Sequence, residues 1–403
     1  MNRSELLASI KKNPSVSVLI IGAGINGIGA FRDLTLNGVD VLIVDRGDFC
    51  SGASAASSHM AHGGIRYLEN GEFRLVREAV GERNRMIQNA PHLVKPLPTT
   101  VPMFKHFSGL LNAPLKFLGW LDKPSERGSV VIKLGLMMYD AYTGKNRIVP
   151  RHKFRGRAES LTRWNRLNSQ IVSTAEYYDG LIRNPERLAL EILLDGEADG
   201  GRALNYVSLA GGQDGRVTLR DELTGDTFDV NPRLVINAAG PWIDAANASL
   251  GQSTRFIGGT KGSHLVLNHP ELREAIGDNE FFFENKDGRI VLIFPLFDKV
   301  LVGTSDIKID NPDLGVEKKR PVDIGTTVNP AEAVYIGKAQ VDGLDNLFPG
   351  TGSGRGGKID QGGFRKIGYH FNIGNFRPDL FFQPAGLGVQ SLDQDIPQGF
   401  IVD

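Results

Sequence analysis

A glycine-rich turn between a buried strand and a helix is the feature that most restricts how this chain can fold. Residues 15–21 are mostly β-branched or aliphatic without clean alternation, as in a parallel strand buried on both faces. From Gly27, apolar residues recur at helical spacing, and Gly38 is placed to end the helix in a left-handed conformation. A second buried strand, 39–44, leads into Asp45. This order predicts a βαβ unit with a right-handed crossover.

The turn has the form G-x-G-x-x-G, with glycines at Gly22, Gly24 and Gly27. The first glycine of this form permits the turn, the second lets the backbone approach a pyrophosphate, and the third allows close packing of helix on strand. Asp45 follows 23 residues after Gly22, where a carboxylate can accept hydrogen bonds from ribose hydroxyls. A carboxylate at this place also disfavours a 2′-phosphate. These four residues are predicted to bind a dinucleotide.

Composition limits the remaining possibilities. The 403 residues are 41% hydrophobic, which is enough for a core and for about two or three domains. Forty-six basic residues balance 46 acidic ones, so the chain has no surplus positive charge of the kind that binds nucleic acid. Cys50 is the single cysteine, which excludes an internal disulfide and a cysteine-based zinc site. No metal site is predicted.

Further along the chain, helical and strand patterns alternate. Residues 71–90 carry apolar positions near one helical face and are predicted to form an amphipathic helix. Strands are predicted within 204–230 and at 234–236, where the chain returns to the first sheet. Residues 255–306 are mostly strand-like, with a turn at 286–289, and predict a mainly antiparallel sheet.

A segment rich in serine and alanine follows the second strand and ends in His62, Gly63 and Gly64. Its small side chains and hydroxyls suit the approach of a phosphate chain, and its glycines allow a flat ring to lie against the backbone. From the residues alone, a helix start followed by a loop is an equally good interpretation.

Several longer stretches are far more specific than the glycine turn, above all GGIRYLE (63–69) and TKGSH (260–264). They lie within INGIGAFRDL, SAASSHMAHGGIRYLE, EFRLVREA, GLMMYDAYTGK, LVINAAGPW, TKGSHLVL, DGRIVLIFPL and VLVGTSD. Together these stretches resemble the FAD-dependent glycerol-3-phosphate dehydrogenases, members of the D-amino-acid-oxidase-like flavoprotein superfamily. The resemblance covers residues 16–310.

Together, the elements and the resemblance predict an α/β fold: an FAD-binding, Rossmann-like doubly wound sheet with an inserted, mainly antiparallel β-sheet substrate domain. Residues 16–100 and 170–250 are expected to form the FAD-binding domain, and 101–169 and 251–310 the substrate or cap domain. Residues 311–403 form a glycine-rich tail with no assignment.

The resemblance implies oxidation of the C2 hydroxyl of sn-glycerol 3-phosphate to dihydroxyacetone phosphate, with hydride passing to the flavin and electrons then to quinone or oxygen. It assigns the adenosine half of FAD to Gly22, Gly24, Gly27 and Asp45. The residues expected near the pyrophosphate and flavin are Ser54, His59, Met60, His62, Gly63 and Gly64. Val207 is expected on the adenine side, and Ala239 and Gly240 in a second nucleotide turn. Arg66, Tyr67 and His264 match positions that face the substrate.

These substrate-facing residues have suitable chemistry, and each also has a structural alternative. A guanidinium such as that of Arg66 suits a phosphate dianion, and a neutral histidine such as His264 suits a base near the reacting hydroxyl. The alternatives are a surface Arg66 paired with Glu69, a half-buried core aromatic at Tyr67, and a strand histidine satisfied by backbone bonds at His264.

The sequence also departs from the family. His59 replaces the lysine that usually precedes the His-Gly-Gly turn, and the 403 residues are not expected to include the C-terminal helical domain usual in the family. The later Ser-Gly-Val-Arg-Pro segment of the family is not found, since Arg377-Pro378 is a poor match. Residues 356–358, Gly-Gly-Lys, with Arg365 after them, resemble a late flavin-contacting segment at altered spacing. Two other hypotheses therefore stay open: a flavoprotein amine oxidase of the glycine or sarcosine type, and a flavin-binding protein without turnover.

Residues 104–121 mix large apolar side chains with Lys105, His106 and Lys116, a composition suited to the surface of a bilayer. A buried lid or a homodimer contact is the alternative. Basic residues between 147 and 157 suit anionic lipid or a solvated loop. The expectation is a cytoplasmic protein, in which peripheral contact with the inner membrane face is one alternative.

Overall fold

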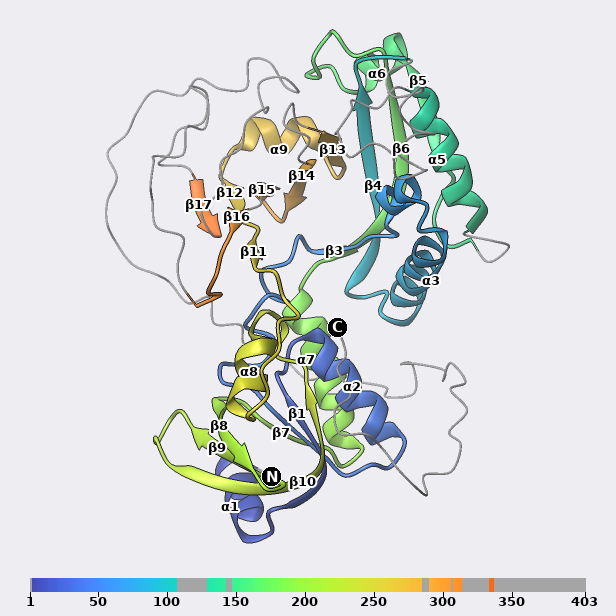
Figure 1. Ribbon diagram of the computed structural model, residues 1–403. Helices are drawn as coiled ribbons and strands as arrows, with labels where there is room; N and C mark the ends of the chain where they lie inside the picture. Colours follow the sequence, from blue (N-terminus) through green and yellow to red (C-terminus); the bar gives the residue numbers. More distant parts are fainter. Residues whose placement is uncertain are drawn as a thin grey trace, which may run out of the picture.

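The computed structural model describes residues 2–106, 129–142, 147–284, 290–305, 307–313 and 333–336. Two sheets build two lobes, and the chain passes between them more than once (Figure 1). The first lobe contains the six-stranded sheet of order β7-β2-β1-β10-β9-β8, and the second contains a nine-stranded sheet.

The first sheet is parallel at its centre, with β1 between β2 and the second half of β10. β7 continues the parallel part beside β2, and β10, β9 and β8 form an antiparallel meander on the other side. The strands are β1 (Ser15–Ile21), β2 (Val41–Val44), β7 (Arg202–Leu204), β8 (Val207–Gln213), β9 (Arg216–Asp221) and β10 (Thr227–Asn237). The predicted strand, helix and strand of the βαβ unit, and the return of the chain to this sheet, are confirmed.

Helices cover both faces of this sheet. α2 and α7 pack together on one face around Phe31, and a buried ion pair joins Arg32 to Asp195 between them. α1 packs through Leu6 and Ile10 on the other face, against the core that also fills the meander. The helices of this lobe are α1 (Arg3–Lys12), α2 (Ile25–Leu36), α7 (Pro185–Ala198), the 3-10 turn η2 (Gly240–Trp242) and α8 (Ile243–Ser249).

The second sheet is mainly antiparallel, with one parallel pairing, between β13 and β4. Its order is β17-β12-β15-β14-β13-β4-β6-β3, and β5 pairs with β6 at the side. The strands are β3 (Met60–Ala61), β4 (Val94–Met103), β5 (Lys153–Gly156), β6 (Ser173–Ile182), β12 (His264–Leu267), β13 (Glu280–Glu284), β14 (Ile290–Leu296), β15 (Lys299–Gly303) and β17 (Ala333–Ile336). β11 (Thr260–Lys261) and β16 (Ile307–Lys308) form a separate pair.

Helices of the second lobe cover this sheet in two groups. α3 and α5 pack on β4 and β6, and α9 packs on β12, β14 and β15. The helical elements are η1 (Ile65–Asn70), α3 (Phe73–Asn89), α5 (Ser129–Tyr142), α6 (Arg157–Arg163) and α9 (Pro270–Ile276). Within the described residues no helix is both long and apolar enough to cross a membrane.

The structure differs from the expected domain boundaries. The elements β3, η1, α3, β4 and β6 fall in the segments expected for the FAD-binding domain, but β3, β4 and β6 are strands of the second sheet, and η1 and α3 pack against it. β4 and β6 pair with each other along their full length. The apolar patterns of β4 and β6 are compatible with either sheet. The two strands are far apart in the sequence, so no local pattern shows that they pair with each other. The predicted turn at 286–289 and most of the tail at 311–403 lie outside the described residues.

Candidate functional site

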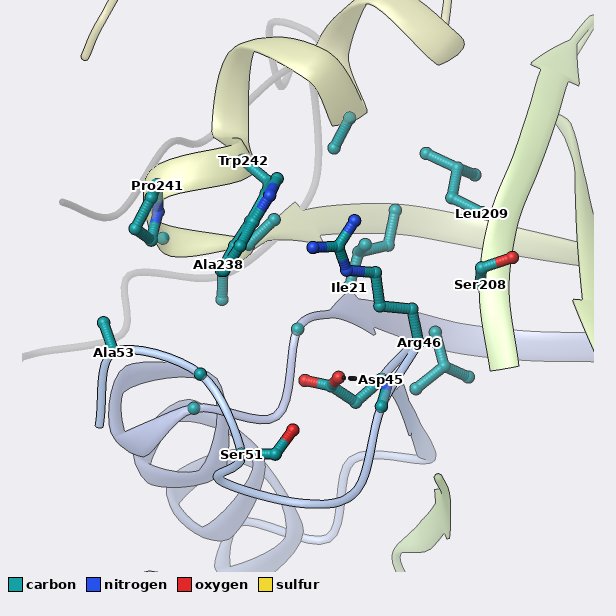
Figure 2. A pocket seen from close by; sticks show the side chains of 18 of the residues that line it. Ile21, Asp45, Arg46, Ser51, Ala53, Ser208, Leu209, Ala238, Pro241 and Trp242 are labelled. Atoms are coloured by element: carbon teal, nitrogen blue, oxygen red, sulfur yellow. Dashed lines mark hydrogen bonds between the residues drawn. The ribbon is translucent and has the colours of Figure 1, made fainter. Parts of the chain in front are cut away.

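A cleft of about 510 Å³ opens where β1, β2 and β10 end in the first lobe (Figure 2). Its position follows from the topology, because the chain leaves β1 toward β2 on one side and returns in β10 on the other, and ligands of doubly wound sheets bind at such a switch point. Seven of the eight residues predicted for the nucleotide half of the cofactor line it: Gly22, Gly24, Asp45, Ser54, Val207, Ala239 and Gly240.

The glycines of the turn are needed for close backbone contacts. Gly22 has φ of +102°, and a Cβ on it would lie 2.4 Å from the carbonyl oxygen of Ala238. A Cβ on Gly27 would lie 1.9 Å from the carbonyl oxygen of Gly22, so this glycine lets α2 start directly against the turn. Gly24 is the N-cap of α2 and leaves the first amides of the helix at the cleft. This is the arrangement that receives a pyrophosphate.

Asp45 is held at the wall of the cleft by two backbone amides. Its Oδ2 accepts a hydrogen bond from Ala23 N at 2.7 Å, and its Oδ1 accepts one from Gly47 N at 2.9 Å. The carboxylate therefore joins the glycine turn to the end of β2. Each of its oxygens keeps a lone pair for a ribose hydroxyl.

The second nucleotide turn has an anchor that the sequence pattern did not reveal. Asn237 donates from Nδ2 to the carbonyl oxygen of Ile243 at 2.9 Å, and its Oδ1 accepts from Ala239 N at 3.1 Å. Gly240 follows with φ of +54°. On the opposite wall, Val207 is fully buried and donates from its amide to the carbonyl oxygen of Asp45 at 2.7 Å.

Ser54 has a more specific position than predicted. Its Oγ accepts a hydrogen bond from Ile25 N at 3.0 Å, so the hydroxyl caps the first amide of α2 from the serine-rich segment. The segment is therefore tied to the glycine turn, and its main chain runs along the same cleft.

Three further residues form a cluster at the cleft that sequence reasoning did not identify. The guanidinium of Arg46 lies 4.4 Å from the ring centroid of Trp242. Asp313 accepts from Arg46 Nη2 at 2.5 Å and from Trp242 Nε1 at 2.8 Å, and the Arg46 guanidinium holds the pKa of Asp313 below its usual value. Figure 2 shows the Arg46 and Trp242 side chains reaching toward each other across the cleft.

A second group of predicted residues gathers at the turn 62–64. Gly64 has φ of +68°, and a Cβ on it would lie 2.6 Å from the ring of Tyr67. The ring centroids of His62 and Tyr67 are 6.3 Å apart. Tyr67 is partly buried and packs against the core between α3 and α5. This is the packing position predicted from the sequence as the alternative to a substrate contact. The backbone of Arg66 lies in η1, and its side chain is outside what the structure describes.

His264 begins β12 on the face of the sheet that carries Val266, because side chains alternate along a strand. That face packs against Met60. The imidazole is 7% exposed, its Nε2 lies 3.2 Å from Ser58 Oγ, and a Cβ on Gly303 would lie 2.2 Å from the ring. Burial, and then the nearby charge of His59, lower the pKa of His264, so the ring is neutral at pH 7.

His59 and Met60 connect this group to the rest of the second lobe. His59 has φ of +57°, and its Nδ1 lies 3.3 Å from the carbonyl oxygen of Arg183. Met60 pairs with Leu181 on β6. The serine-rich segment thus leaves the nucleotide cleft at Ser54 and reaches the neighbourhood of His264 at Ser58.

Residues 17–363 match the sequence model of the DAO family, described as FAD dependent oxidoreductase. The chain belongs to this family. The match extends 53 residues beyond Asp310, where the resemblance seen in the sequence ends.

Two curated relatives of this flavoprotein are informative. A glycerol-3-phosphate dehydrogenase of Synechocystis sp. is 33% identical over 74% of this chain and 53% of its own length. A D-erythritol 1-phosphate dehydrogenase of Brucella abortus is 30% identical over 77% of this chain and 59% of its own length. The chain therefore spans somewhat more than half the length of these relatives.

The solved glycerol-3-phosphate dehydrogenase of Bacillus halodurans, complexed with FAD, matches the fold. Its TM-score is 0.56 at 23% identity, over 78% of this chain and 52% of that one. An L-alpha-glycerophosphate oxidase of Mycoplasma pneumoniae with FAD bound gives a TM-score of 0.55 at 15% identity, over 75% of each chain. Both likenesses support the predicted fold class.

The cofactor of this flavoprotein is FAD, and the residues present fit it. Gly22 and Gly27 allow the tight turn, Gly24 begins α2 at the cleft, where a pyrophosphate binds in turns of this form, and Asp45 presents carboxylate oxygens on the ribose side. The serine-rich segment then leads to the turn 62–64, whose glycines lack a Cβ and therefore lie directly against the Tyr139 and Tyr67 side chains.

Replacing Arg46 by alanine is expected to raise the dissociation constant for FAD about 3- to 10-fold. The variant loses the cation–π contact with Trp242 and the ion pair with Asp313, which hold these side chains in place at the cleft. A cleft wall that is less fixed before binding costs about 1 kcal/mol of FAD affinity. Fluorescence titration of the apoprotein with FAD measures this change. Arg216→Ala, which removes a surface ion pair with Asp229 on β9 and β10, is the matched control and should bind FAD like the parent. Equal affinity of Arg46→Ala and the parent would contradict the prediction.

Proposed function

We propose that this chain oxidises the C2 hydroxyl of sn-glycerol 3-phosphate to dihydroxyacetone phosphate, with FAD as the hydride acceptor. The observation that carries the proposal is the buried, neutral His264 next to the segment that leads from the nucleotide cleft to the turn 62–64. The names of the Synechocystis and Bacillus relatives support the substrate.

Each step of the proposed reaction requires a different group. FAD, when bound, supplies the two-electron acceptor for the hydride that leaves C2. His264 is the base that takes the hydroxyl proton, because only a neutral imidazole has a free lone pair to accept it. Ser58 orients that imidazole through Nε2. Arg66, the second residue after the turn and part of η1, is proposed to bind the phosphate dianion as a guanidinium fork.

The size of the substrate is a separate question, which the Brucella abortus relative raises by its name. A steady-state assay of the FAD-loaded protein with an artificial electron acceptor compares sn-glycerol 3-phosphate, D-erythritol 1-phosphate and sarcosine. The proposal expects the highest kcat/KM with glycerol 3-phosphate and dihydroxyacetone phosphate as the product. A preference for the longer polyol phosphate would change the substrate within the same chemistry, and turnover of sarcosine alone would favour the amine-oxidase hypothesis. Failure with all three would favour a flavin-binding protein without turnover.

We also propose that the electrons pass to quinone at a membrane surface, which the protein contacts through α5 and the preceding segment 104–121. The support is an apolar stripe on α5: Val130, Leu134 and Met137 are 45%, 61% and 54% exposed and lie on one helical face. Phe104, before this helix in the chain, is 38% exposed. Residues 107–121 lie outside the described residues. An exposed apolar face of this kind suits the acyl boundary of a bilayer.

Replacing Leu134 and Met137 together by glutamate is expected to reduce vesicle binding several-fold, because two charges would have to enter the apolar boundary. Co-sedimentation with vesicles of mixed neutral and anionic lipid measures the bound fraction. Leu223→Glu, on an equally exposed leucine of the first lobe, is the control and should bind like the parent. If the double variant binds equally well, the stripe is not the membrane contact. Should the parent instead be a dimer that this variant splits, the stripe is an interface between copies.

A further inference from the structure

A buried polar network lies beneath the turn 62–64. Arg83 on α3, Tyr139 on α5 and Asp179 on β6 are 1%, 2% and 3% exposed. Arg83 Nη1 donates to Tyr139 Oη at 2.8 Å and lies 3.5 Å from Asp179 Oδ1. Tyr139 Oη donates to the same carboxylate oxygen at 2.6 Å.

The network is joined to the turn through one backbone amide. Gly63 N donates to Asp179 Oδ1 at 3.0 Å. A Cβ on Gly63 would lie only 1.9 Å from Tyr139 Oη, so the turn rests directly on the phenol. Burial raises the pKa of Tyr139 well above its usual value, and the hydroxyl therefore keeps the proton that it donates. These contacts of Gly63 with Asp179 and Tyr139 therefore fix the position and orientation of the turn backbone.

Packing alone does not account for this network. An ion pair in the interior loses much of its Coulombic gain to desolvation, and apolar groups of the same volume often stabilise a fold as well. Arg83 also donates from Nη1 to the carbonyl oxygen of Tyr178 at 2.7 Å and from Nη2 to Asn84 Oδ1 at 2.8 Å, so the cation is fixed in place. The fixed Arg83 guanidinium and the fixed Asp179 carboxylate therefore determine both the geometry of the turn 62–64 and the charge next to it.

We propose that Arg83, Asp179 and Tyr139 are positioning residues that hold the backbone of the turn 62–64 against the isoalloxazine and balance the charge beneath it. This inference rests on the proposed function, in which that turn faces the flavin. Reduced flavin carries negative charge, so an added positive charge near it favours reduction. The charge balance of the network therefore influences the reduction potential of bound FAD.

The test measures the potential of bound FAD by reductive titration with a chemical reductant, which needs no substrate. Asp179→Asn keeps an oxygen that can accept from Gly63 N but leaves Arg83 without its counter-charge, and the potential is expected to rise. The matched control is Asp195→Asn, which breaks the buried Arg32–Asp195 pair in the first lobe. It is expected to lower stability without moving the potential. An unchanged potential in Asp179→Asn, or an equal shift in both variants, overturns the inference.

A second variant keeps the test decisive if Asp179→Asn folds poorly. Tyr139→Phe preserves every charge and removes only the hydroxyl, so the dissociation constant for FAD is expected to rise about 3- to 10-fold with the potential unchanged. Tyr177→Phe removes a hydroxyl from a ring 5.8 Å away in the same core and should bind FAD like the parent. Equal affinities in the two variants overturn the positioning role. If the parent binds FAD but fails to oxidise glycerol 3-phosphate, the proposed function fails, and these measurements still decide the inference.

Discussion

Glutamine in place of His264 is expected to slow the reduction of bound FAD by glycerol 3-phosphate about 10²- to 10⁴-fold, the usual contribution of a positioned base. The amide can still bond to Ser58, but it cannot take the proton of the substrate hydroxyl. Rapid anaerobic mixing, followed through the flavin absorbance, measures the rate. The affinity for FAD should remain within about twofold of the parent, because the imidazole is on β12 and outside the nucleotide cleft.

The pH profile separates a base from a packing residue. An imidazole accepts a proton only above its pKa, and burial lowers the pKa of His264, so the reduction rate of the parent should fall only below about pH 6.5. His264→Gln should lose this acidic limb. His59→Asn removes a charge that lowers the same pKa and should move the limb to higher pH. A glutamine variant that keeps the limb, or that loses less than about tenfold in rate, would show that another group is the base.

Glu280→Gln is expected to remove a large pH dependence from the free energy of unfolding. Glu280 on β13 is 1% exposed, and its Oε2 accepts from Thr99 Oγ1 at 2.8 Å. Its Oε1 has no hydrogen-bond partner among the described residues. Burial, together with a smaller effect of the Asp179 charge, raises the pKa of Glu280 to about 8 against the opposing effect of the Thr99 hydrogen bond.

The sign of the effect follows from proton binding. Between pH 4.5 and about 8 the folded state keeps a proton on Glu280 that the unfolded state has lost, so the free energy of unfolding falls as pH rises through this window. The full loss is about 5 kcal/mol. Glutamine is neutral at every pH and keeps the acceptor for Thr99. The variant should therefore gain stability relative to the parent from pH 5 to pH 8.

Urea unfolding of the FAD-saturated protein at pH 5, 6, 7 and 8 measures this gain as a difference between variant and parent. Taking the difference removes the contribution of every other titrating group. Glu222→Gln replaces an exposed glutamate and should run parallel to the parent. A difference that is the same at pH 5 and pH 8 would show that Glu280 ionises normally in the folded chain.

Much of the first lobe could be predicted because its signals are local. An unbroken apolar run, three glycines at fixed spacing and helical periodicity lie within residues 15–45, and they define β1, α2 and β2. The assignment of β4 and β6 failed because their partners are each other, with α5 between them along the chain. Strand propensity shows that a strand forms and does not show which sheet it joins.

The candidate site divides in the same way. Gly22 and Gly27 could be identified from their spacing, because a side chain at either position would clash with the backbone of the turn. Arg83 and Asp179 look like ordinary surface charges in the sequence, and only the packing of α3 against β6 buries them together. Asp313 is 267 residues from Arg46 and lies in a stretch without periodicity. Arginine and aspartate are common residues, so the sequence does not show which of them will form an ion pair when the two lie far apart in the chain.

The most direct test of the proposed oxidation is the absorbance of the FAD-loaded protein when sn-glycerol 3-phosphate is added without oxygen. We expect the yellow band to bleach at a rate that rapid mixing resolves, and substrate deuterated at C2 to bleach it several-fold more slowly because that bond is broken. A band that stays unchanged with this substrate, yet is bleached by a chemical reductant, would contradict the proposal.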